Sequence, residues 1–361
     1  MKSIMFVCNT YSQLIESIQL RLTTFQDCAV SVIISDHSNN AESIYKRVKQ
    51  IGIFKNVYYI ETKNNHEQIN SFFSKLRELN RYVMGKDPLW ENLICGEIDE
   101  LIFYNQTDEI YTLFAKLYNC NPRIKVARYE EGVLSYGDWE VHSQKARIAA
   151  IIRHLRKQKA LEEVLYGFYC FYPTLYKGNL TPLRIPTIDS SSRVAEVIRE
   201  IFDIKDGMEC YNNYKYIFFS SVYDFEGGKP IGELNTILEI AKFIGNDNLL
   251  VKVHPRDNPR RFEERGLHTD KKSNIPWEAI QLGNDFSNHT FLTTNSGSVL
   301  SISLIQKNQP QIKYVYPLCS ITNNQSAMKT VKSIEALLDS GFAKQHISNI
   351  KVINRMEEIV D

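Results

Sequence analysis

The chain has 361 residues, of which 24% are charged, and its 43 Lys and Arg nearly balance its 42 Asp and Glu. The resulting net charge of +1 gives the protein no general basic character, so no nucleic-acid partner is expected. The length exceeds what one compact core usually holds and predicts two domains. Seven scattered cysteines without C-x-x-C spacing indicate reduced thiols rather than disulfides or a zinc site.

The apolar run at the N-terminus, Ile4–Cys8, is too short for the core of a signal peptide or for a membrane span. No other apolar run approaches the length of about 18 residues that a spanning helix needs. We therefore expect a soluble, cytoplasmic protein, and a peripheral contact with the inner face of the membrane stays open.

The first half of the chain alternates strand patterns rich in β-branched and aromatic residues with amphipathic helical patterns. This alternation predicts a parallel sheet covered by helices on both faces. The predicted strands are 4–8, 29–35, 57–60, 101–104 and 124–129, and the predicted helices are 13–22, 41–51, 66–82 and 109–118.

Residues 145–165 are predicted to form one helix with a high density of positive charge. Its basic residues are Lys145, Arg147, Arg153, His154, Arg156, Lys157 and Lys159, beside a stripe of Ile and Leu. A solvated face, a peripheral membrane contact through 145–159 and a contact with a partner helix, as in a homodimer, are the alternatives.

A second series of strands and helices begins near Tyr214, after a stretch punctuated by prolines at 178–186. Its predicted strands are 216–221, 249–253, 291–294 and 311–316, and its predicted helices are 232–244, 276–282, one that ends at 306, and 327–340. We assign 1–180 to an N-terminal domain, 181–212 to a linker region, 213–345 to a C-terminal domain and 346–361 to a tail that packs back on the N-terminal domain. Two Rossmann-like α/β domains that face each other across a cleft describe the GT-B architecture, with the ligand between the domains.

The sequence Lys252-Val253-His254-Pro255 closes one predicted strand of the second series. Ligands of open α/β sheets bind outside the carboxyl ends of the strands. Side chains two apart on a strand share a face, so Lys252 and His254 can converge on one anion before Pro255 ends the strand. The next strand runs into a turn rich in hydroxyls and backbone N–H groups, which predicts an anion site with Thr294, Ser296 and Ser298.

The sequence Glu130-Glu131-Gly132 follows a predicted strand of the first half. A carboxylate held near an acceptor hydroxyl can act as a general base, which contributes typically about 10²–10⁴-fold. Adjacent strand residues point to opposite faces, so at most one of the two faces the ligand; Glu130 is preferred and Glu131 is the alternative. Asp224 and Glu226, after the first strand of the second domain, are rival positions for the base.

The chain has no Asp-x-Asp, no His-x₃-His and no cysteine cluster, and we expect no metal site. The charge of a leaving group would then be met by Lys, His and Ser side chains.

Taken together, these residues resemble the motifs of bacterial sialyltransferases, most closely glycosyltransferase family 52 of the lipooligosaccharide and capsule type. Residues 6–13, Phe-Val-Cys-Asn-Thr-Tyr-Ser-Gln, are similar to that family's opening strand and its Cys-x-Thr-x-x-Gln, which contains Thr10 and Gln13. Glu130-Glu131-Gly132 is similar to the acidic motif of bacterial sialyltransferases, His254-Pro255 to their HP motif, and residues 294–298 to their Ser/Thr motif. The four motifs occur in the family's order.

The resemblance implies a GT-B fold, an inverting reaction without metal, and CMP-sialic acid as donor substrate with no other cofactor. It implies that His254 assists the departing CMP phosphate, that Ser296 binds this phosphate, and that Lys252 contacts the cytosine or the phosphate. It also implies that Glu278 binds the ribose and that Glu130 deprotonates the acceptor. In some relatives the base lies where Asp224 and Glu226 stand.

We therefore expect transfer of sialic acid to a terminal sugar, with galactose as the expected acceptor, on a capsule or lipooligosaccharide glycan. The alternatives are a GT-B transferase with another nucleotide donor (a hexosyltransferase or a CDP-glycerol type), a nucleotide-sugar epimerase or hydrolase, and a non-catalytic glycan- or lipid-binding module.

Overall fold

The structure, a computed structural model, describes residues 1–361 except 63–78, 94–95, 137–143, 205–208, 271–274, 306–309 and 342–348. The chain divides into two compact units, each with its own sheet. The first unit comprises Met1–Glu131 and Ser135–Pro186, and the second comprises Gly132–Leu134 and Thr187–Asp361.

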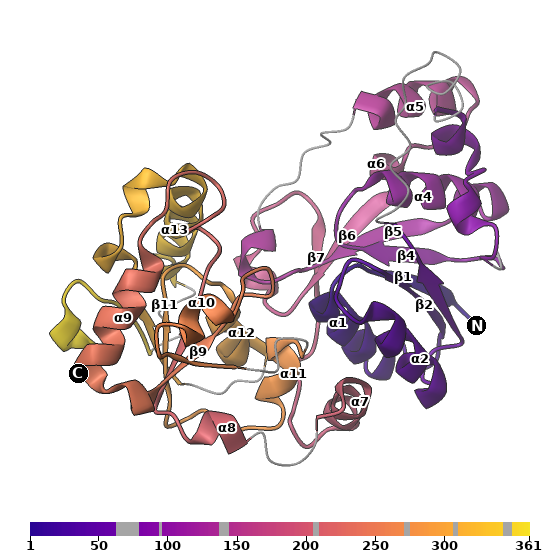
Figure 1. Cartoon of the computed structure of the whole chain (residues 1–361). Coiled ribbons are helices and arrows are strands. Elements are labelled where there is room, and N and C mark those ends of the chain that lie inside the picture. Colours follow the sequence, from indigo (N-terminus) through magenta and orange to yellow (C-terminus); the bar gives the residue numbers. More distant parts are fainter. Residues whose placement is uncertain are drawn as a thin grey trace. The chain divides into compact units, whose positions relative to one another are not determined.

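The first unit is built on a parallel sheet in the order β3-β2-β1-β4-β5-β6-β7. The chain starts in the middle, moves outward to β3 and then crosses to β4, which is the doubly wound order of Rossmann-like folds. Figure 1 shows α1 and α2 on one face of this sheet and α4 and α6 on the other. The strands are β1 (Ser3–Cys8), β2 (Ala29–Ser35), β3 (Asn56–Ile60), β4 (Glu100–Phe103), β5 (Lys125–Tyr129), β6 (Leu165–Cys170) and β7 (Thr181–Arg184). The helices are α1 (Tyr11–Leu22), α2 (Ala41–Ile51), α4 (Asp108–Cys120), α5 (Gln144–Leu155) and α6 (Leu161–Val164).

The five strands predicted for the first half are confirmed, as is the predicted parallel arrangement. They were recognisable because strands buried on both faces are continuously apolar, and all side chains of Ile4–Cys8 are buried. The predicted helices 13–22, 41–51 and 109–118 are confirmed as α1, α2 and α4. Most of the helix predicted at 66–82 lies outside the described residues. The described residues 79–84 are helical.

The prediction of one helix over 145–165 was wrong. Helix α5 ends at Leu155, and Lys157 adopts the left-handed conformation, with φ of 58°, that reverses the chain. The buried guanidinium of Arg153 stabilises this reversal, because its Nε donates to the carbonyl of Lys159 at 2.8 Å. After the short α6, Leu165–Cys170 form β6. Three of these six residues are aromatic, in keeping with the strand preference of aromatic side chains.

The second unit repeats the same winding in a parallel sheet with the order β10-β9-β8-β11-β12-β13. The strands predicted for the second half are confirmed as β8, β9, β11 and β12. The strands are β8 (Tyr216–Phe219), β9 (Leu249–Lys252), β10 (His268–Thr269), β11 (Thr290–Thr293), β12 (Gln311–Tyr314) and β13 (Ile350–Val352). The helices are α7 (Arg193–Phe202), α8 (Glu209–Asn212), α9 (Glu233–Ile244), α10 (Arg260–Glu263), α11 (Trp277–Gln281), α12 (Ser298–Ile305) and α13 (Gln325–Leu338).

The structure corrects the expected linker region 181–212. Residues Thr181–Arg184 form β7 and pair with β6 in the first sheet. Helix α7 belongs to the second unit, where Arg199 donates to the carbonyl of Leu282 at 3.0 Å. The division between the units falls between Pro186 and Thr187.

The described part of the tail, 349–361, belongs to the second unit, whereas the sequence analysis assigned the tail to the N-terminal domain. Its strand β13 pairs with β12, and the side chains of Ile353 and Ile359 join the core of this unit. The ammonium group of Lys313 on β12 is buried and donates to the carbonyl oxygens of Glu358 and Ile359 at 3.0 and 2.9 Å. These two hydrogen bonds fix the end of the chain.

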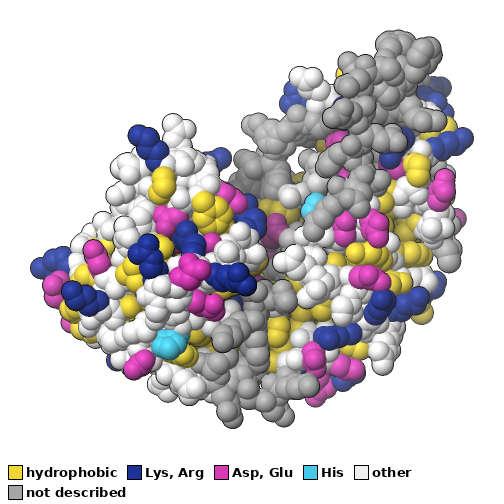
Figure 2. Space-filling model, viewed as in Figure 1, with side chains coloured by type: hydrophobic (Ala, Val, Ile, Leu, Met, Phe, Trp, Pro, Cys, Tyr) yellow, Lys and Arg dark blue, Asp and Glu magenta, His cyan; other side chains and the backbone are white. Residues whose placement is uncertain are grey.

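No helix in the described part of the chain is long and apolar enough to cross a membrane. On the face shown in Figure 2, basic and acidic side chains are interspersed over each unit, in keeping with the balanced composition.

Substituting Lys313 should loosen the tail. In Lys313→Met the carbonyls of Glu358 and Ile359 lose their charged donor, and unsatisfied buried carbonyls cost about 1–3 kcal/mol. We expect a lower urea midpoint and faster hydrogen exchange of residues 353–361. Lys242→Met, at an exposed position of α9, is the control and should change neither quantity. Equal exchange in the two variants would show that Lys313 does not hold the tail.

Candidate active site

The carboxyl edge of the second sheet gathers three chain segments that the sequence singled out. Strand β8 lies between β9 and β11, and the winding reverses between β8 and β11. Phe219, Lys252 and Thr293 lie side by side as the last paired residues of these three strands. The residues that follow each strand therefore meet at the point of reversal, where Rossmann-like folds bind their ligands.

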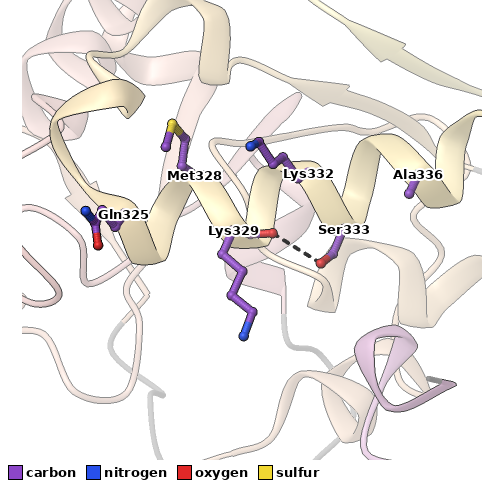
Figure 3. Close-up of a pocket in the computed structure, with 6 residues that line it drawn as sticks. All are labelled: Gln325, Met328, Lys329, Lys332, Ser333 and Ala336. Carbon is purple, nitrogen blue, oxygen red and sulfur yellow. Dashed lines mark hydrogen bonds between the residues drawn. The ribbon is translucent and has the colours of Figure 1, made fainter. Parts of the chain in front are cut away.

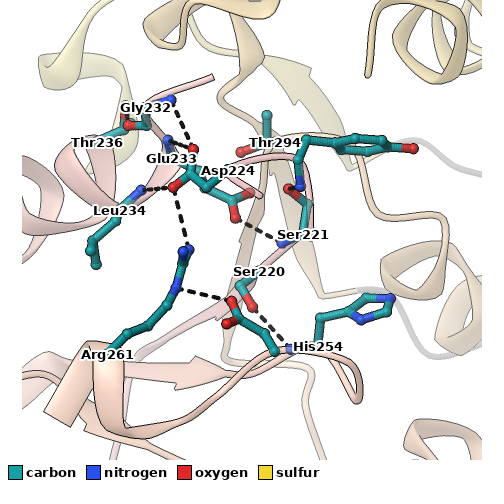
Figure 4. A network of polar contacts seen from close by, with 12 residues as sticks. Ser220, Ser221, Asp224, Gly232, Glu233, Leu234, Thr236, His254, Arg261 and Thr294 are labelled. Carbon is teal, nitrogen blue, oxygen red and sulfur yellow. Dashed lines mark hydrogen bonds and ion pairs between the residues drawn. The ribbon is translucent and has the colours of Figure 1, made fainter. Parts of the chain in front are cut away.

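His254 is held at this edge by its neighbours on both sides. Its backbone N–H donates to the Ser220 hydroxyl at 2.9 Å, which ties the end of β9 to the end of β8. Its Nδ1 accepts from the backbone N–H of Arg256 at 3.2 Å, so the neutral ring carries its proton on Nε2. Figure 4 shows the imidazole projecting away from the polar network behind it. Burial, with a smaller contribution from Arg256, lowers the pKa of His254 to about 4.

The turn after β11 is organised by its own hydroxyl groups. The hydroxyl of Thr293 donates to the carbonyl of Phe219 at 2.9 Å and accepts from the N–H of Ser296 at 3.0 Å. The hydroxyl of Ser296 accepts from the N–H of Ser298, the first residue of α12, at 3.2 Å. Ser296 is half-buried and Ser298 is exposed, whereas Thr294 is fully buried. The structure thus brings Ser296 and Ser298 to the accessible start of α12 and places Thr294 beneath them.

Lys252 has a partner within the protein. Its ammonium group forms an ion pair with the buried Asp270 at 3.1 Å and lies 5.8 Å from the centre of the Trp277 ring. Trp277 begins α11, on which the half-buried Glu278 follows. The expected convergence of Lys252 and His254 on one anion therefore competes with an internal ion pair. Pro255 is exposed, but β9 ends at Lys252, so His254 and Pro255 lie in the turn after the strand and not, as expected, at its last positions.

Asp224, a rival candidate for the base, is engaged at the start of α9. Its Oδ1 accepts from the N–H groups of Gly232 and Glu233 at 2.9 and 3.0 Å, and its Oδ2 accepts from that of Leu234 at 3.0 Å (Figure 4). Oδ2 also lies 3.3 Å from the guanidinium of Arg261. These contacts describe a helix cap and argue against a role as base. The neighbouring Glu226 pairs with Arg256 at 2.7 Å.

Glu233 is a member of this network that the sequence analysis did not single out. Its carboxylate is fully buried, and Oε2 accepts from the N–H of Ser221, directly after β8, at 2.7 Å. Burial raises the pKa of Glu233 to about 7. Hydrogen bonds from Thr294 and Ser221 stabilise the charged carboxylate and offset part of this rise. Glu233 thus holds the chain next to Ser220, the residue that positions His254. In the sequence it looks like an ordinary acidic residue in a first helical turn.

The first unit places its acidic pair at the carboxyl edge of its own sheet. Glu130 is buried, and its Oε2 accepts from the N–H of Phe171 at 2.8 Å and from the hydroxyl of Tyr136. Both of these hydrogen bonds fall on one oxygen, which orients the carboxyl group. Burial raises the pKa of Glu130 to about 7, although the two donors act in the opposite direction.

Glu131 is half-buried and links the end of β5 to the start of α1. Its Oε1 accepts from the hydroxyl of Thr10 and the amide of Gln13, both at 2.9 Å. Thr10 and Gln13 also form the capping box of α1, so the opening motif fixes a helix start and a carboxylate together. Burial raises the pKa of Glu131, and its two donors partly offset this rise.

The described residues hold no further candidate site of two other kinds, a metal centre and a pocket at the predicted residues. They contain no group of three or more His, Cys, Asp or Glu side chains that could hold a metal ion. A shallow pocket follows one face of α13 and is lined by side chains of that helix, none of which belongs to the predicted site (Figure 3).

Solved structures resemble the chain over its whole length. An alpha/beta-galactoside alpha-2,3-sialyltransferase from the luminous marine bacterium Photobacterium phosphoreum is 12% identical, with a TM-score of 0.52 and coverage of 99% of each chain. S. aureus MnaA, solved with UDP, is 12% identical with a TM-score of 0.48, over 99% of this chain and 94% of that one. A comparison with curated protein sequences finds no match. Two doubly wound parallel sheets, together with the likeness to the Photobacterium phosphoreum structure, define the GT-B fold.

A family model described as alpha-2,8-polysialyltransferase matches residues 4–287. The chain therefore belongs to the alpha-2,8-polysialyltransferase family and is a glycosyltransferase, in agreement with the expected resemblance to bacterial sialyltransferases.

The buried acid Glu233 should make stability depend on pH. Folded, its carboxyl group keeps its proton up to about pH 7; unfolded, it loses the proton near the ordinary value of 4.5. Stability is therefore lost as the pH rises from about 4.5 to about 7. The side chain that Glu233→Gln introduces cannot ionise. The free energy of unfolding of this variant, minus that of the natural protein, should therefore increase by about 3 kcal/mol when the pH is raised from about 5 to about 8.

Urea unfolding of both proteins at the two pH values measures this difference. Glu239→Gln, on the exposed side of the same helix, is the control and should show no such change. A gain that is the same at both pH values would show that Glu233 is ionised in the folded protein.

Proposed function

We propose that this enzyme transfers sialic acid from CMP-sialic acid to a terminal sugar of a bacterial surface glycan, a capsule polysaccharide or a lipooligosaccharide. Family membership establishes sialyl transfer in the broad sense. The observation that carries the donor proposal is the placement of the His254 imidazole, with Nε2 as its only donor, at the carboxyl edge that also carries Ser296 and the start of α12. A phosphate that departs from the anomeric carbon needs such donors.

His254 acts on the leaving group in this proposal. With its pKa lowered to about 4, the free imidazole is neutral and donates a hydrogen bond through Nε2 to a phosphate oxygen. As the bond between the anomeric carbon and that phosphate breaks, negative charge grows on the oxygen and favours transfer of the proton. The Ser296 hydroxyl and the N–H groups at the start of α12 supply further donors without a formal charge.

Glu130 is the base in this proposal. A desolvated carboxylate with a pKa of about 7 and one oxygen fixed by two donors is suited to take a proton near neutral pH. It removes the proton of the acceptor hydroxyl while that oxygen attacks the anomeric carbon from the side opposite to the phosphate, which inverts the configuration. Glu131, more exposed and held by Thr10 and Gln13, is the alternative base.

The remaining assignments concern specificity. Glu278 on α11 is proposed to bind the ribose hydroxyls and Lys252, near Trp277, to line the cytosine side of the site. The description of the family favours the terminal sialic acid of a growing chain as acceptor. Galactose is the other acceptor that the proposal includes, and the linkage product distinguishes the two.

Charge-neutral variants should identify the base. Glu130→Gln should lower kcat by about 10²–10⁴-fold, because no carboxylate remains to accept the proton. In the natural enzyme kcat/KM should fall about tenfold per pH unit below about pH 7, where Glu130 is protonated. Glu131→Gln should keep this pH dependence at a lower rate. The measurement is initial-rate CMP release between about pH 5 and about pH 9.

His254→Ala should lower kcat by about 10²–10⁴-fold in the same assay, and Glu239→Gln should leave it unchanged. If Glu131→Gln removes activity and Glu130→Gln retains it, the base is Glu131. If both acidic variants keep the natural rate and pH profile, the acidic motif takes no part in proton transfer.

Donor identity and metal independence are tested together. CMP should be released from CMP-sialic acid in the presence of an acceptor, at the same rate with and without EDTA, since protein donors meet the phosphate charge. Turnover with a UDP-sugar alone would replace the donor proposal, and transfer to water alone would make the enzyme a hydrolase. Loss of activity in EDTA that Mg²⁺ restores would contradict metal independence.

A further inference from the structure

Helix α5 of the first unit carries a stripe of exposed apolar side chains. Ile148, Ile151 and Leu155 are 51%, 62% and 80% exposed, and they are three of the seven large hydrophobic residues exposed in the described chain. Steps of three and four residues along a helix return to the same side, so the three side chains form one ridge. A ridge of this kind is uncommon on a surface that faces water.

The orientation of the ridge is fixed by the opposite side of the helix. Ala146 and Ala149 are buried in the core of the first unit. The guanidinium of Arg153 is buried as well, donates to the carbonyl of Val83 at 3.1 Å and lies 4.7 Å from the Tyr118 ring. At 3.6 residues per turn, the buried side and the ridge lie roughly 160° apart, so the ridge points away from the core of the first unit.

Basic side chains flank the ridge on both sides. Residues 144–159 contain no Asp or Glu. By helical spacing Arg147 and His154 lie on one side of the ridge, and Lys145 and Arg156 on the other. The exposed basic residues of the helix and the turn after it are Lys145, Arg147, His154, Arg156, Lys157 and Lys159. Acidic contacts offset part of this charge; they include Lys145 with Asp108 at 3.4 Å and His154 with Glu163 at 2.6 Å.

We infer that α5 is a membrane-surface helix that lies in the plane of an anionic bilayer. The ridge would enter the boundary between headgroups and acyl chains, and the basic rows on either side would meet the anionic headgroups. The charge distribution argues against a second copy of this helix as the occupant, because two such faces would bring like charges together. A polyanionic glycan would use the basic rows but would leave the apolar ridge in water.

Vesicle binding of the full-length protein tests this inference. We expect sedimentation with vesicles of two parts phosphatidylcholine to one part phosphatidylglycerol, with affinity at least about tenfold above that for phosphatidylcholine alone and lower at high salt. The variant Ile148→Ser/Ile151→Ser/Leu155→Ser should lose at least about tenfold in affinity. Phe243→Ser removes an exposed hydrophobic residue outside the ridge, 45% exposed on α9, and should bind as the natural protein does.

A fluorescence reporter and an activity assay distinguish loss of membrane binding from loss of folding. A Leu155→Trp reporter should shift its emission to the blue on anionic vesicles. Sialyl transfer to a soluble acceptor should be unchanged in the triple variant, because none of its three residues belongs to the candidate site, and this shows that the variant is folded. Equal vesicle binding by the triple variant would overturn the inference, as would a failure of the natural protein to bind. A triple variant that loses only self-association would assign the ridge to a second copy of the chain.

Discussion

Every paired strand in the two described sheets is parallel, and the candidate site depends on this constraint. Parallel strands end at one edge, so a residue that follows one strand is placed beside residues that follow its neighbours, whatever their separation in sequence. In the second unit this brings His254 next to Ser220, 34 residues earlier. Because the register of β8 and β9 places these two residues side by side, the hydrogen bond between them fixes the backbone of His254 and so the position of its imidazole ring. A loop without this constraint could not hold the ring so closely.

At this edge each unit holds a buried carboxylic acid that accepts a backbone N–H from the end of a neighbouring strand. In the first unit Glu130 accepts a backbone N–H from Phe171, just after β6, and in the second Glu233 accepts one from Ser221, just after β8. Burial raises the pKa of each to about 7. The two acids differ in surroundings: Glu130 lies in the acidic motif at a strand end, whereas Glu233 starts a helix beneath the Ser-rich turn. The first is suited to exchange protons and the second to hold strand ends together.

The sequence predicted the central strands and the helices that cover them, because buried parallel strands have a continuous apolar signal. It assigned no strand at β6, which follows the wrongly extended helix 145–165. It also missed the edge strands β7, which contains Pro182, and β10 and β13, which are two and three residues long, because short edge strands carry little apolar pattern. Helix α7 was overlooked inside an assumed linker, although Ser192 caps it and its apolar residues recur at helical spacing. The domain boundary was misplaced for this reason.

Within the candidate site, the motifs predicted which segments meet but not what each side chain contacts. The cap that Asp224 forms involves N–H groups eight to ten residues away, and the Lys252–Asp270 pair bridges 18 residues through β10. Burial of Glu233 has no signature in its neighbours in sequence. Such properties arise from tertiary packing, so a single sequence could not reveal them.

The pairing of Lys252 with Asp270 leaves the edge of the second sheet with hydroxyls, backbone N–H groups and a neutral ring, and with one fewer unpaired positive charge. A spent nucleotide held by dipoles dissociates more readily than one clamped by a bare ammonium ion. Under the proposed function, such weak binding would allow the spent nucleotide to be exchanged for fresh donor quickly after each transfer.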